Sequence, residues 1–290
     1  MSNNLIVPEN LRKEKQKFFL NTTEMAGIQS LQGGYENQAS PMKFLGMGVP
    51  VMVPGGKQVG NFSLNALVID SDRFLSFTGN AGFNGYILKS RTDTNQNFSF
   101  TSGYLTSYES RASVGSIPEV SVNFSAFGNV GYLISSEPSA NVSSDFSTIA
   151  AGSTSLTPQI AGPGSITLSL SDFTSNRVLS YNLNIDCPRN PIYPLGTKYP
   201  TAVEINWPIT VSLNLQYAVN TYVARNLRDF PNNQKIENLV LTLKTFDTDA
   251  TITTYRFNEM SLIKESYNIG TEGHAVIDAT YKVYLGRPIA

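Results

Sequence analysis

The sequence contains a single cysteine, Cys187, and a single histidine, His274, among its 290 residues. One cysteine cannot form a disulfide within the chain, and one Cys and one His cannot complete a structural zinc site. A Ser-His-Asp or Cys-His catalytic site would depend on His274, which no nucleophile-elbow pattern accompanies. The sequence therefore predicts no catalytic residue, no metal site and no cofactor, and we expect a protein that is not an enzyme.

Charge is also scarce, since only 15% of the residues are Asp, Glu, Lys or Arg and the net charge is −1. Proteins that grip nucleic acid do so through a clustered cationic surface, which this composition does not favour. A weakly charged surface rich in Ser, Thr and Asn suits a protein whose faces meet other subunits. A secreted, loop-rich β-protein is the alternative interpretation.

Long apolar runs are missing as well. No stretch is long enough to span a bilayer, and the first 20 residues lack a cationic start followed by an apolar core. We therefore expect neither secretion nor a membrane partner.

Residues 28–50 and 178–200 look like two versions of one segment. Aligned without a gap at a displacement of 150 (191 − 41), they share five residues: Ser30 and Ser180, Pro41 and Pro191, Leu45 and Leu195, Gly46 and Gly196, Pro50 and Pro200. Phe62–Asn65 then matches Val211–Asn214 at a displacement of 149 (212 − 63). Near the end, Phe98, Phe100, Leu105 and Phe124 match Tyr255, Phe257, Leu262 and Tyr281 at 157 (255 − 98). Ordered matches of this kind indicate an internal repeat, so we interpret the chain as two copies of one unit.

The repeat divides the chain into four parts. Residues 1–24 form an N-terminal arm, residues 25–130 a first β domain and residues 178–290 a second β domain. The intervening residues 131–177 are poor in charge and rich in Ser, Ala, Gly and Pro, a composition typical of a linker or a long surface loop.

Alternation of apolar and polar residues predicts that most of the chain is β-strand. Residues 209–219 place Ile, Val, Leu and Tyr side chains on one face and Thr, Ser, Asn and Gln on the other, as in a half-buried antiparallel strand. Residues 118–126, 166–171, 179–186 and 275–285 repeat this pattern. The predicted fold class is mainly β, with two tandem antiparallel β-sandwich or barrel domains and one or two short helices, over residues 11–20 and 220–230.

Four residues are candidate subunit contacts. Phe18 and Phe19 end the N-terminal arm, which either docks on a neighbour or frays. Arg189 lies in a Pro-rich loop where it can form an intersubunit ion pair. Trp207 is a candidate core or subunit-contact residue, with a sugar-binding platform beside the loops of Tyr193 and Tyr199 as the alternative.

Two segments resemble tail tube and related virion proteins of tailed bacteriophages. They are LSYNLNIDCPRNPIYPLGTKYPTAVEINWPITVSLNL, residues 179–215, and GYLTSYESRASVGSIPEVSVNFSAFG, residues 103–128. The resemblance implies a small β-sandwich or barrel that forms rings of six copies, stacked into a hollow tube for DNA passage. With two copies per chain, three chains would close a pseudo-sixfold ring, and a hexamer of chains is the alternative. It also implies other phage tail proteins as partners, a place in the virion tail, and host cytoplasm during assembly.

A conduit for DNA needs a wetted wall without strong phosphate contacts. The polar positions of three predicted strands are therefore candidate lumen-facing residues: Ser63, Asn65, Ser121, Asn123, Ser125, Ser212, Asn214 and Gln216. The alternative is that these faces meet bulk water or another subunit.

Three functions follow from these observations. The first is a tail tube subunit through which DNA passes without specific binding. The second is a tail-tip or head-tail adaptor of the same fold, and the third is a carbohydrate-binding β-sandwich protein.

Overall fold

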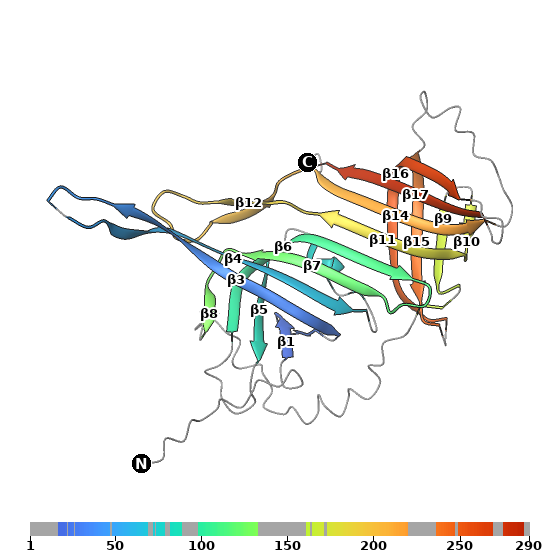
Figure 1. Ribbon diagram of the computed structural model, residues 1–290, viewed down its shortest axis with the longest axis horizontal. Coiled ribbons are helices and arrows are strands. Elements are labelled where there is room, and N and C mark those ends of the chain that lie inside the picture. Colours follow the sequence, from blue (N-terminus) through green and yellow to red (C-terminus); the bar gives the residue numbers. More distant parts are fainter. Residues whose placement is uncertain are drawn as a thin grey trace, which may run out of the picture.

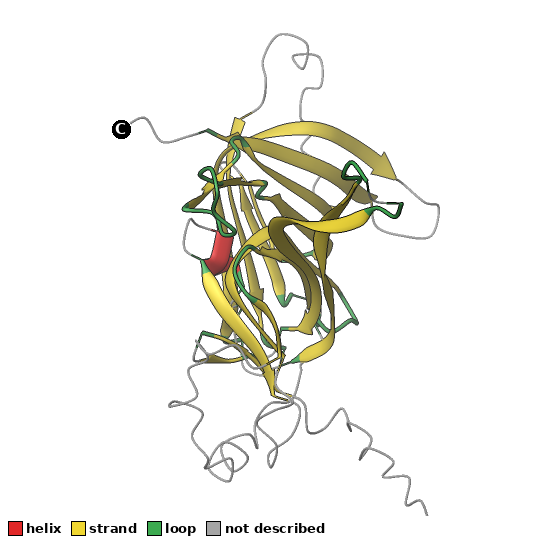
Figure 2. Ribbon diagram, turned by 90° about the vertical axis from the view of Figure 1, so that its left-hand side faces the viewer, coloured by secondary structure: helices red, strands yellow, loops and turns green. Residues whose placement is uncertain are grey.

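The computed structural model describes most of the chain as antiparallel strands (Figures 1 and 2). The described residues are 17–21, 23–25, 27–46, 48–68, 72, 74–78, 82–88, 98–132, 161–162, 164–170, 173–219, 236–246, 249–268 and 275–286. One large sheet joins fifteen strands, and a separate ladder joins two more. The prediction of a mainly β, antiparallel, sandwich-like fold is therefore confirmed.

The strands divide into two groups. The first strand group is β1 (Lys17–Leu20), β2 (Thr23–Glu24), β3 (Ile28–Met42), β4 (Val51–Leu67), β5 (Phe83–Leu88), β6 (Phe98–Ser113), β7 (Glu119–Ala126) and β8 (Val130–Tyr132). The second strand group is β9 (Ile166–Leu170), β10 (Phe173–Ser175), β11 (Val178–Asp186), β12 (Arg189–Ile192), β13 (Ala202–Ile205), β14 (Ile209–Val219), β15 (Ile236–Lys244), β16 (Thr251–Asn268) and β17 (Ala275–Leu285).

Both groups pair their strands in the same order. Hydrogen-bonded neighbours follow the path β2-β1-β5-β6-β7-β4-β3 in the first group. In the second group the path is β10-β9-β15-β16-β17-β14-β11. Each strand of the first path has a counterpart at the same place in the second, so the two groups share one topology.

The register of pairing is shared too, including its irregularities. Leu105 faces Phe124 and Ser107 faces Asn123, with a register shift between the two pairs. At a displacement of 157 (262 − 105), Leu262 faces Tyr281 and Lys264 faces Thr280, with the same shift. β-Bulges bend a strand at a defined place, so the long strands β6 and β16 are bent at equivalent positions.

A second register shift is repeated in the hairpins. It lies between Ile28 and Ser30 where β3 pairs with β4, and between Val178 and Ser180 where β11 pairs with β14. Strand pairing also corrects the alignment of the repeat. Phe62 faces Phe124 and Leu213 faces Tyr281. Phe62 therefore corresponds to Leu213, two residues beyond the Val211 that the sequence alignment gives. An even slip keeps each side chain on its own face, so the predicted faces are unaffected.

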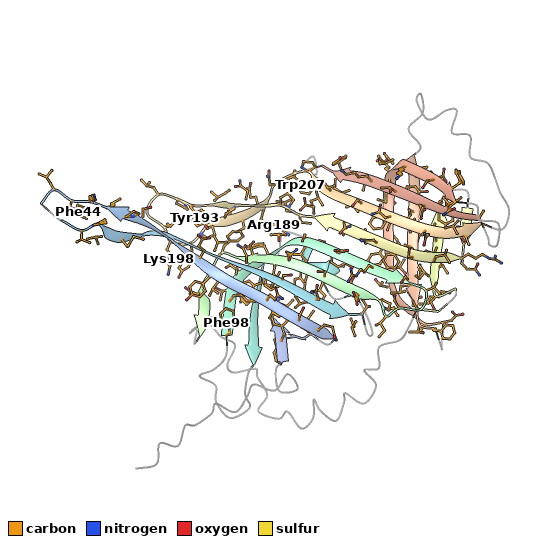
Figure 3. The ribbon with its side chains drawn as sticks, viewed as in Figure 1. Phe44, Phe98, Arg189, Tyr193, Lys198 and Trp207 are labelled. Carbon is orange, nitrogen blue, oxygen red and sulfur yellow. The ribbon has the colours of Figure 1, made fainter. Side chains whose placement is uncertain are left out.

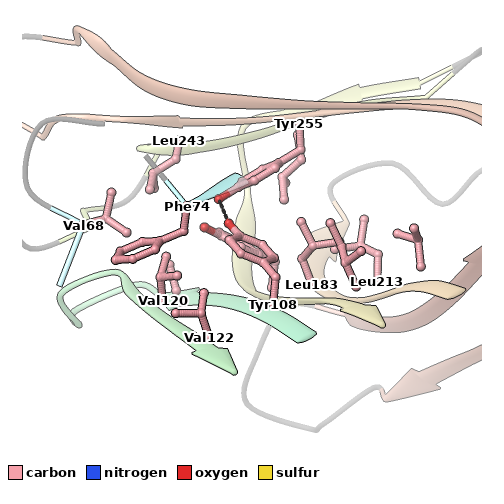
Figure 4. Packing of buried hydrophobic residues seen from close by; sticks show 14 of the residues in the cluster. Val68, Phe74, Tyr108, Val120, Val122, Leu183, Leu213, Leu243 and Tyr255 are labelled. Atoms are coloured by element: carbon pink, nitrogen blue, oxygen red, sulfur yellow. Dashed lines mark hydrogen bonds between the residues drawn. The ribbon is translucent and has the colours of Figure 1, made fainter. Parts of the chain in front are cut away.

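The apolar faces of both groups form one continuous core. Alternation along β14 buries Val211, Leu213, Leu215 and Tyr217, as the sequence predicts. In the first group four phenylalanine rings pack together, with five ring-centroid distances of 4.9–6.0 Å among them, namely Phe62, Phe83, Phe100 and Phe124. Figure 4 shows side chains of the first group, such as Val122, near side chains of the second, such as Leu183.

The predicted helix over residues 11–20 is wrong at its end, because Lys17–Leu20 is strand β1. This segment pairs with β5 and buries Phe18, Phe19 and Leu20, whereas an isolated helix of ten residues is marginal in water. The helix predicted over residues 220–230 lies outside the described residues. Among the described residues, the helical turn is the 3-10 segment η2 (Leu75–Thr78).

Strands β9 and β10 belong to the range 131–177 that the sequence suggests is a linker. β9 pairs with β15 and carries the buried residues Ile166, Leu168 and Leu170. Residues 133–160 of the same range lie outside the described residues.

We expect Leu213→Ala to lower the free energy of unfolding by about 2–5 kcal/mol, because it leaves a cavity at a fully buried site in the core. Leu195→Ala is the matched control, since Leu195 is fully exposed at a hairpin tip, and its effect should stay within about 0.5 kcal/mol. Urea unfolding of the two variants measures both values. Equal losses would contradict the described core.

Candidate assembly interface

The two strand groups are joined edge to edge by backbone pairing. The second half of β6, Ser107–Ser113, leaves its neighbour β5 and pairs with Ser180–Asp186 of β11. The bonds continue at both ends, where the Cys187 N–H donates to the Thr106 carbonyl and the Val114 N–H donates to the Leu179 carbonyl, each over 2.8 Å. We call this β6–β11 pairing the joint; Figure 1 shows the two strands side by side.

A row of directly opposed polar residues crosses the joint from one strand group to the other. Successive cross-strand partners on β3, β4, β7, β6, β11, β14 and β17 are Ser30, Asn65, Ser121, Glu109, Asn184, Ser212 and Lys282. Directly opposed residues share a face of the sheet, so this row defines a single polar face. The opposite face points into the core.

All eight candidate lumen-facing residues lie on this polar face. Within the first group, the Ser121 hydroxyl donates to Asn65 over 2.7 Å and Asn65 donates to Ser30 over 3.1 Å. Within the second, Thr280 donates to Asn214 and Gln216 donates to Asp278, both over 2.9 Å. The remaining candidates, Ser63, Asn123, Ser125 and Ser212, alternate with buried residues in the same strands.

On the polar face one hydrogen bond between side chains crosses the joint, and a second continues it along β11. Asn182 of β11 donates to the Glu109 carboxylate of β6 over 3.0 Å, and Asn184 donates to Asn182 over 3.0 Å. Beside them Arg111 forms an ion pair with Glu119, with 2.6 Å between Nη2 and Oε2. The polar face is therefore continuous and internally hydrogen-bonded where the two groups meet.

A buried polar cluster lies beneath the joint. The Tyr108 and Tyr255 hydroxyls, from different strand groups, are 2.9 Å apart (Figure 4). Tyr255 also lies 2.9 Å from Ser110 Oγ and 3.0 Å from Asp72 Oδ2, and Tyr108 donates to the same Asp72 oxygen. Tyr181 completes the cluster at 3.1 Å from Ser110. Such a network stabilises the joint because removing one member leaves buried partners unsatisfied.

Burial raises the pKa of these tyrosines. The pKa of Tyr181 rises to about 12 because its phenol is desolvated. Desolvation is also the main cause that raises the pKa values of Tyr108 and Tyr255, and the charge of Asp72 adds to it. The cluster therefore keeps its phenols protonated, as hydrogen-bond donors, up to strongly alkaline pH.

Two hairpin arms extend beyond the polar face, toward the same side of the molecule (Figures 1 and 3). The first arm is residues 39–54 of hairpin β3–β4, and the second arm is residues 189–205, which carry β12 and β13. Ala39 faces Pro54 in the first, and Arg189 faces Ile205 in the second. Both tips turn at a glycine with positive φ, Gly46 and Gly196, a conformation that glycine adopts at little cost.

The second arm lies against the first strand group. Arg189 donates to the Leu105 carbonyl over 2.8 Å and to the Thr78 carbonyl over 3.2 Å, and its guanidinium lies over the Tyr104 ring. Burial lowers the pKa of Arg189. At the far end of the arm, the Tyr199 hydroxyl donates to Asn129.

The first arm instead exposes a series of large apolar side chains. They are Met42, Phe44, Leu45, Val49, Val51 and Met52. The first arm is therefore a candidate protein contact site.

The structure distributes the four candidate subunit-contact residues within a single chain. Phe18 and Phe19 are buried in β1, so residues 17–20 of the predicted arm belong to the sheet. Arg189 contacts carbonyl groups of the first strand group, as described. Trp207 is half-buried before β14, against the core. Whether any of the four also meets a second chain stays a prediction.

The described residues contain no group of three His, Cys, Asp or Glu side chains placed to hold a metal ion. His274 lies outside the described residues. Cys187 is fully buried at the joint, and desolvation raises the pKa of its thiol to about 11. Among the described residues, no helix is both long and apolar enough to cross a membrane.

Neither the joint nor the tyrosine cluster is foreseen in the sequence. Ser110 is the one available signal, because it stands at a core position in an otherwise regular alternation. A polar residue at a core position needs a buried partner, but its identity depends on the three-dimensional arrangement.

Comparison with known proteins adds no family assignment. A scan against protein-family models finds no match, and a search of curated proteins also finds none.

The tyrosine cluster predicts alkaline destabilisation. The pKa of Tyr181 is about 12 in the folded protein and about 10 in the unfolded chain. Its contribution is fully present below about pH 10 and is lost as the pH rises through about 12, which amounts to about 2–3 kcal/mol. Urea unfolding at a series of pH values should show this fall, and Tyr181→Phe should reduce its slope. The exposed Tyr284→Phe is the control, and an unchanged slope in Tyr181→Phe would contradict the assignment.

Proposed function

We propose that the chain is a structural subunit of a bacteriophage tail tube, in which copies join head to tail into rings that stack around a channel for DNA. The observation that carries the proposal is the repeated topology and register of the two strand groups, which meet edge to edge at the joint. We infer that the two groups are duplicated copies of one tube-like unit. A joint between like units within a chain is the contact that a ring of such units repeats.

The polar face supports this function through its chemistry. It is continuous across the joint, and neighbouring amides and hydroxyls satisfy one another, as Asn123 and Ser107 do over 2.7 Å. A wall of this kind is wetted without offering a dense array of cations to phosphate groups. In the proposed ring this face lines the channel, and the apolar face packs against the outer strands β1, β5, β9 and β15.

The arm tips support stacking of rings. Leu195 remains fully exposed although its own arm lies on the first strand group, and Leu45 is equally exposed at the tip of the first arm. Because both arms extend toward the same side (Figure 1), the two leucines are free to insert into an adjacent ring. Burial of each leucine would contribute about 2 kcal/mol per contact.

A three-chain ring holds six units, which is the stoichiometry we propose, with a six-chain ring as the alternative. An adaptor at the tail tip, or at the connection between head and tail, would form the same ring without stacking. The exposed tip leucines favour the stacked form.

The test is the size and shape of the purified full-length protein. We expect mass photometry to show closed species of three chains, and negative-stain microscopy to show rings and tubes with a central channel. The double variant Leu45→Glu, Leu195→Glu should give rings that do not stack, because it places charge at both tips. A matched double variant that adds the same two charges at exposed polar sites away from the tips, Asn176→Glu with Asn206→Glu, should still form tubes.

A protein that stays monomeric at every concentration, alone and with other tail proteins, would overturn the proposed function. Rings that form without ever stacking, in the parent protein as well as the tip variant, would replace the tube with the adaptor.

A further inference from the structure

Two of the open strand edges in the described chain belong to β3 and β16. β3 pairs with β4 along one edge, and its other edge has no partner among the described residues. β16 pairs with β15 as far as Ser261, and from there to Asn268 it pairs on the opposite edge with β17. A long unprotected edge is a template for another strand.

These two edges are the counterparts of the strands that form the joint. β3 occupies the place in the first group that β11 occupies in the second, and β16 occupies the place of β6. In the joint Arg111 faces Asn182 and Ser107 faces Asp186. Adding 157 to the β6 residues gives Asn268 and Lys264 in β16, and subtracting 150 from the β11 residues gives Gln32 and Glu36 in β3. The equivalent pairs are therefore Asn268 with Gln32, and Lys264 with Glu36.

We propose that β16 of one copy pairs antiparallel with β3 of a second copy of this chain, with Asn268 opposite Gln32 and Lys264 opposite Glu36. The proposal rests on the proposed self-assembly and specifies its interface and register. It makes the contact between chains a repetition of the joint within each chain. A head-to-tail contact of this kind closes into a ring or continues as a filament.

The side chains on the polar face are complementary in this register. Glu36 and Lys264 are both exposed, and opposite charges directly across two strands stabilise their pairing. Gln32 and Asn268 are exposed amides that can hydrogen-bond to each other. Gln32 faces Ser63, which faces Asn123, so the polar face of one copy continues into that of the next.

A buried carboxylate faces the other side of the same edge. Both carboxylate oxygens of Glu265 are buried, and no described residue hydrogen-bonds to them. Leaving such a group without a donor is costly. In the proposed register Tyr35 of the second copy stands directly opposite Glu265. Its side chain is 53% exposed in the single chain, and its hydroxyl is a donor of the type that Glu265 lacks.

Exposed apolar residues lie where the first arm of the second copy would pack. The second arm lies beside Thr106, whose carbonyl accepts from the Cys187 N–H. Its Arg189 lies over the Tyr104 ring, which contacts the Phe127 ring. The displacement of 157 carries Thr106 and Phe127 to Ile263 and Tyr284. Phe127 is 5% exposed, whereas Ile263 is 53% and Tyr284 60% exposed. In the proposed pairing, the apolar first arm of the second copy would cover Ile263 and Tyr284.

The same pairing cannot form within one chain. Six strands separate β3 from β16 along the sheet, namely β4, β7, β6, β11, β14 and β17. The seven steps between them, at about 4.8 Å each, place the two strands about 34 Å apart along the sheet.

Paired cysteines test the register in the full-length protein. Cα atoms directly opposite in an antiparallel ladder are about 5 Å apart, within disulfide range. Four residues of slip along the strand add about 13 Å. We therefore expect oxidation to link chains in Gln32→Cys with Asn268→Cys, and in Glu36→Cys with Lys264→Cys. The mismatched combinations Gln32→Cys with Lys264→Cys, and Glu36→Cys with Asn268→Cys, should give at least about tenfold less linked product.

All four substituted positions are exposed, so each variant should fold, and the parent protein controls for the buried Cys187. Mixing chains that carry only Gln32→Cys with chains that carry only Asn268→Cys should give linked dimers, which places the bond between copies. Rings that form by microscopy but show equal linking in matched and mismatched pairs, or none, would overturn this interface and leave the proposed function standing. A parent protein that is monomeric throughout would overturn both.

Discussion

Backbone pairing between β6 and β11 is the interaction on which the rest of the structure depends. It converts two sets of strands, each with an open edge, into one sheet with a common core and a common polar face. β6 belongs to both parts of the sheet, because its first half pairs with β5 and its second half pairs with β7 and with β11 of the second strand group. The bulge between Leu105 and Ser107 lies between these two roles, where a local bend is required.

The joint is specified from both of its faces. Beneath it, the tyrosine cluster ties Asp72 and Tyr108 of the first group to Tyr255 of the second. Above it, the Glu109 carboxylate accepts a hydrogen bond from Asn182. Arg189 of the second arm donates hydrogen bonds to the Leu105 and Thr78 carbonyls. Backbone pairing alone tolerates slippage. The side chains on both faces make one register preferable, which a repeating assembly needs.

Alternation along single strands was enough to predict which side chains share a face. For this reason Ser63, Ser121 and Ser212 lie on one face of the sheet, as their strand patterns predict. Alternation does not detect an even slip, because a shift of two residues leaves every side chain on the same face. The sequence therefore aligns Phe62 with Val211, whereas the structure aligns it with Leu213. It also says nothing about which strands are neighbours, so the joint depends on contacts that only the fold reveals.

Local composition favours the wrong conformation where tertiary pairing decides it. Lys17–Leu20 follows a charged run that favours a helix, yet Phe18 and Leu20 are buried when the segment is extended against β5. β9 has only Ile, Leu, Ser and Thr and follows a Ser- and Gly-rich stretch. Its alternation predicts a strand over residues 166–171, which the structure confirms, whereas the composition of the whole range 131–177 predicts a linker or a long surface loop.

The central claim is that one joint geometry is used both within and between chains. A cryo-electron microscopy map of the assembled particle, resolved well enough to trace strands, tests it most directly. The account predicts that β3 of each chain adds to β16 of its neighbour in the register of the joint, with the polar face toward the channel. A map in which β3 faces solvent, or in which chains meet through other surfaces, would contradict it.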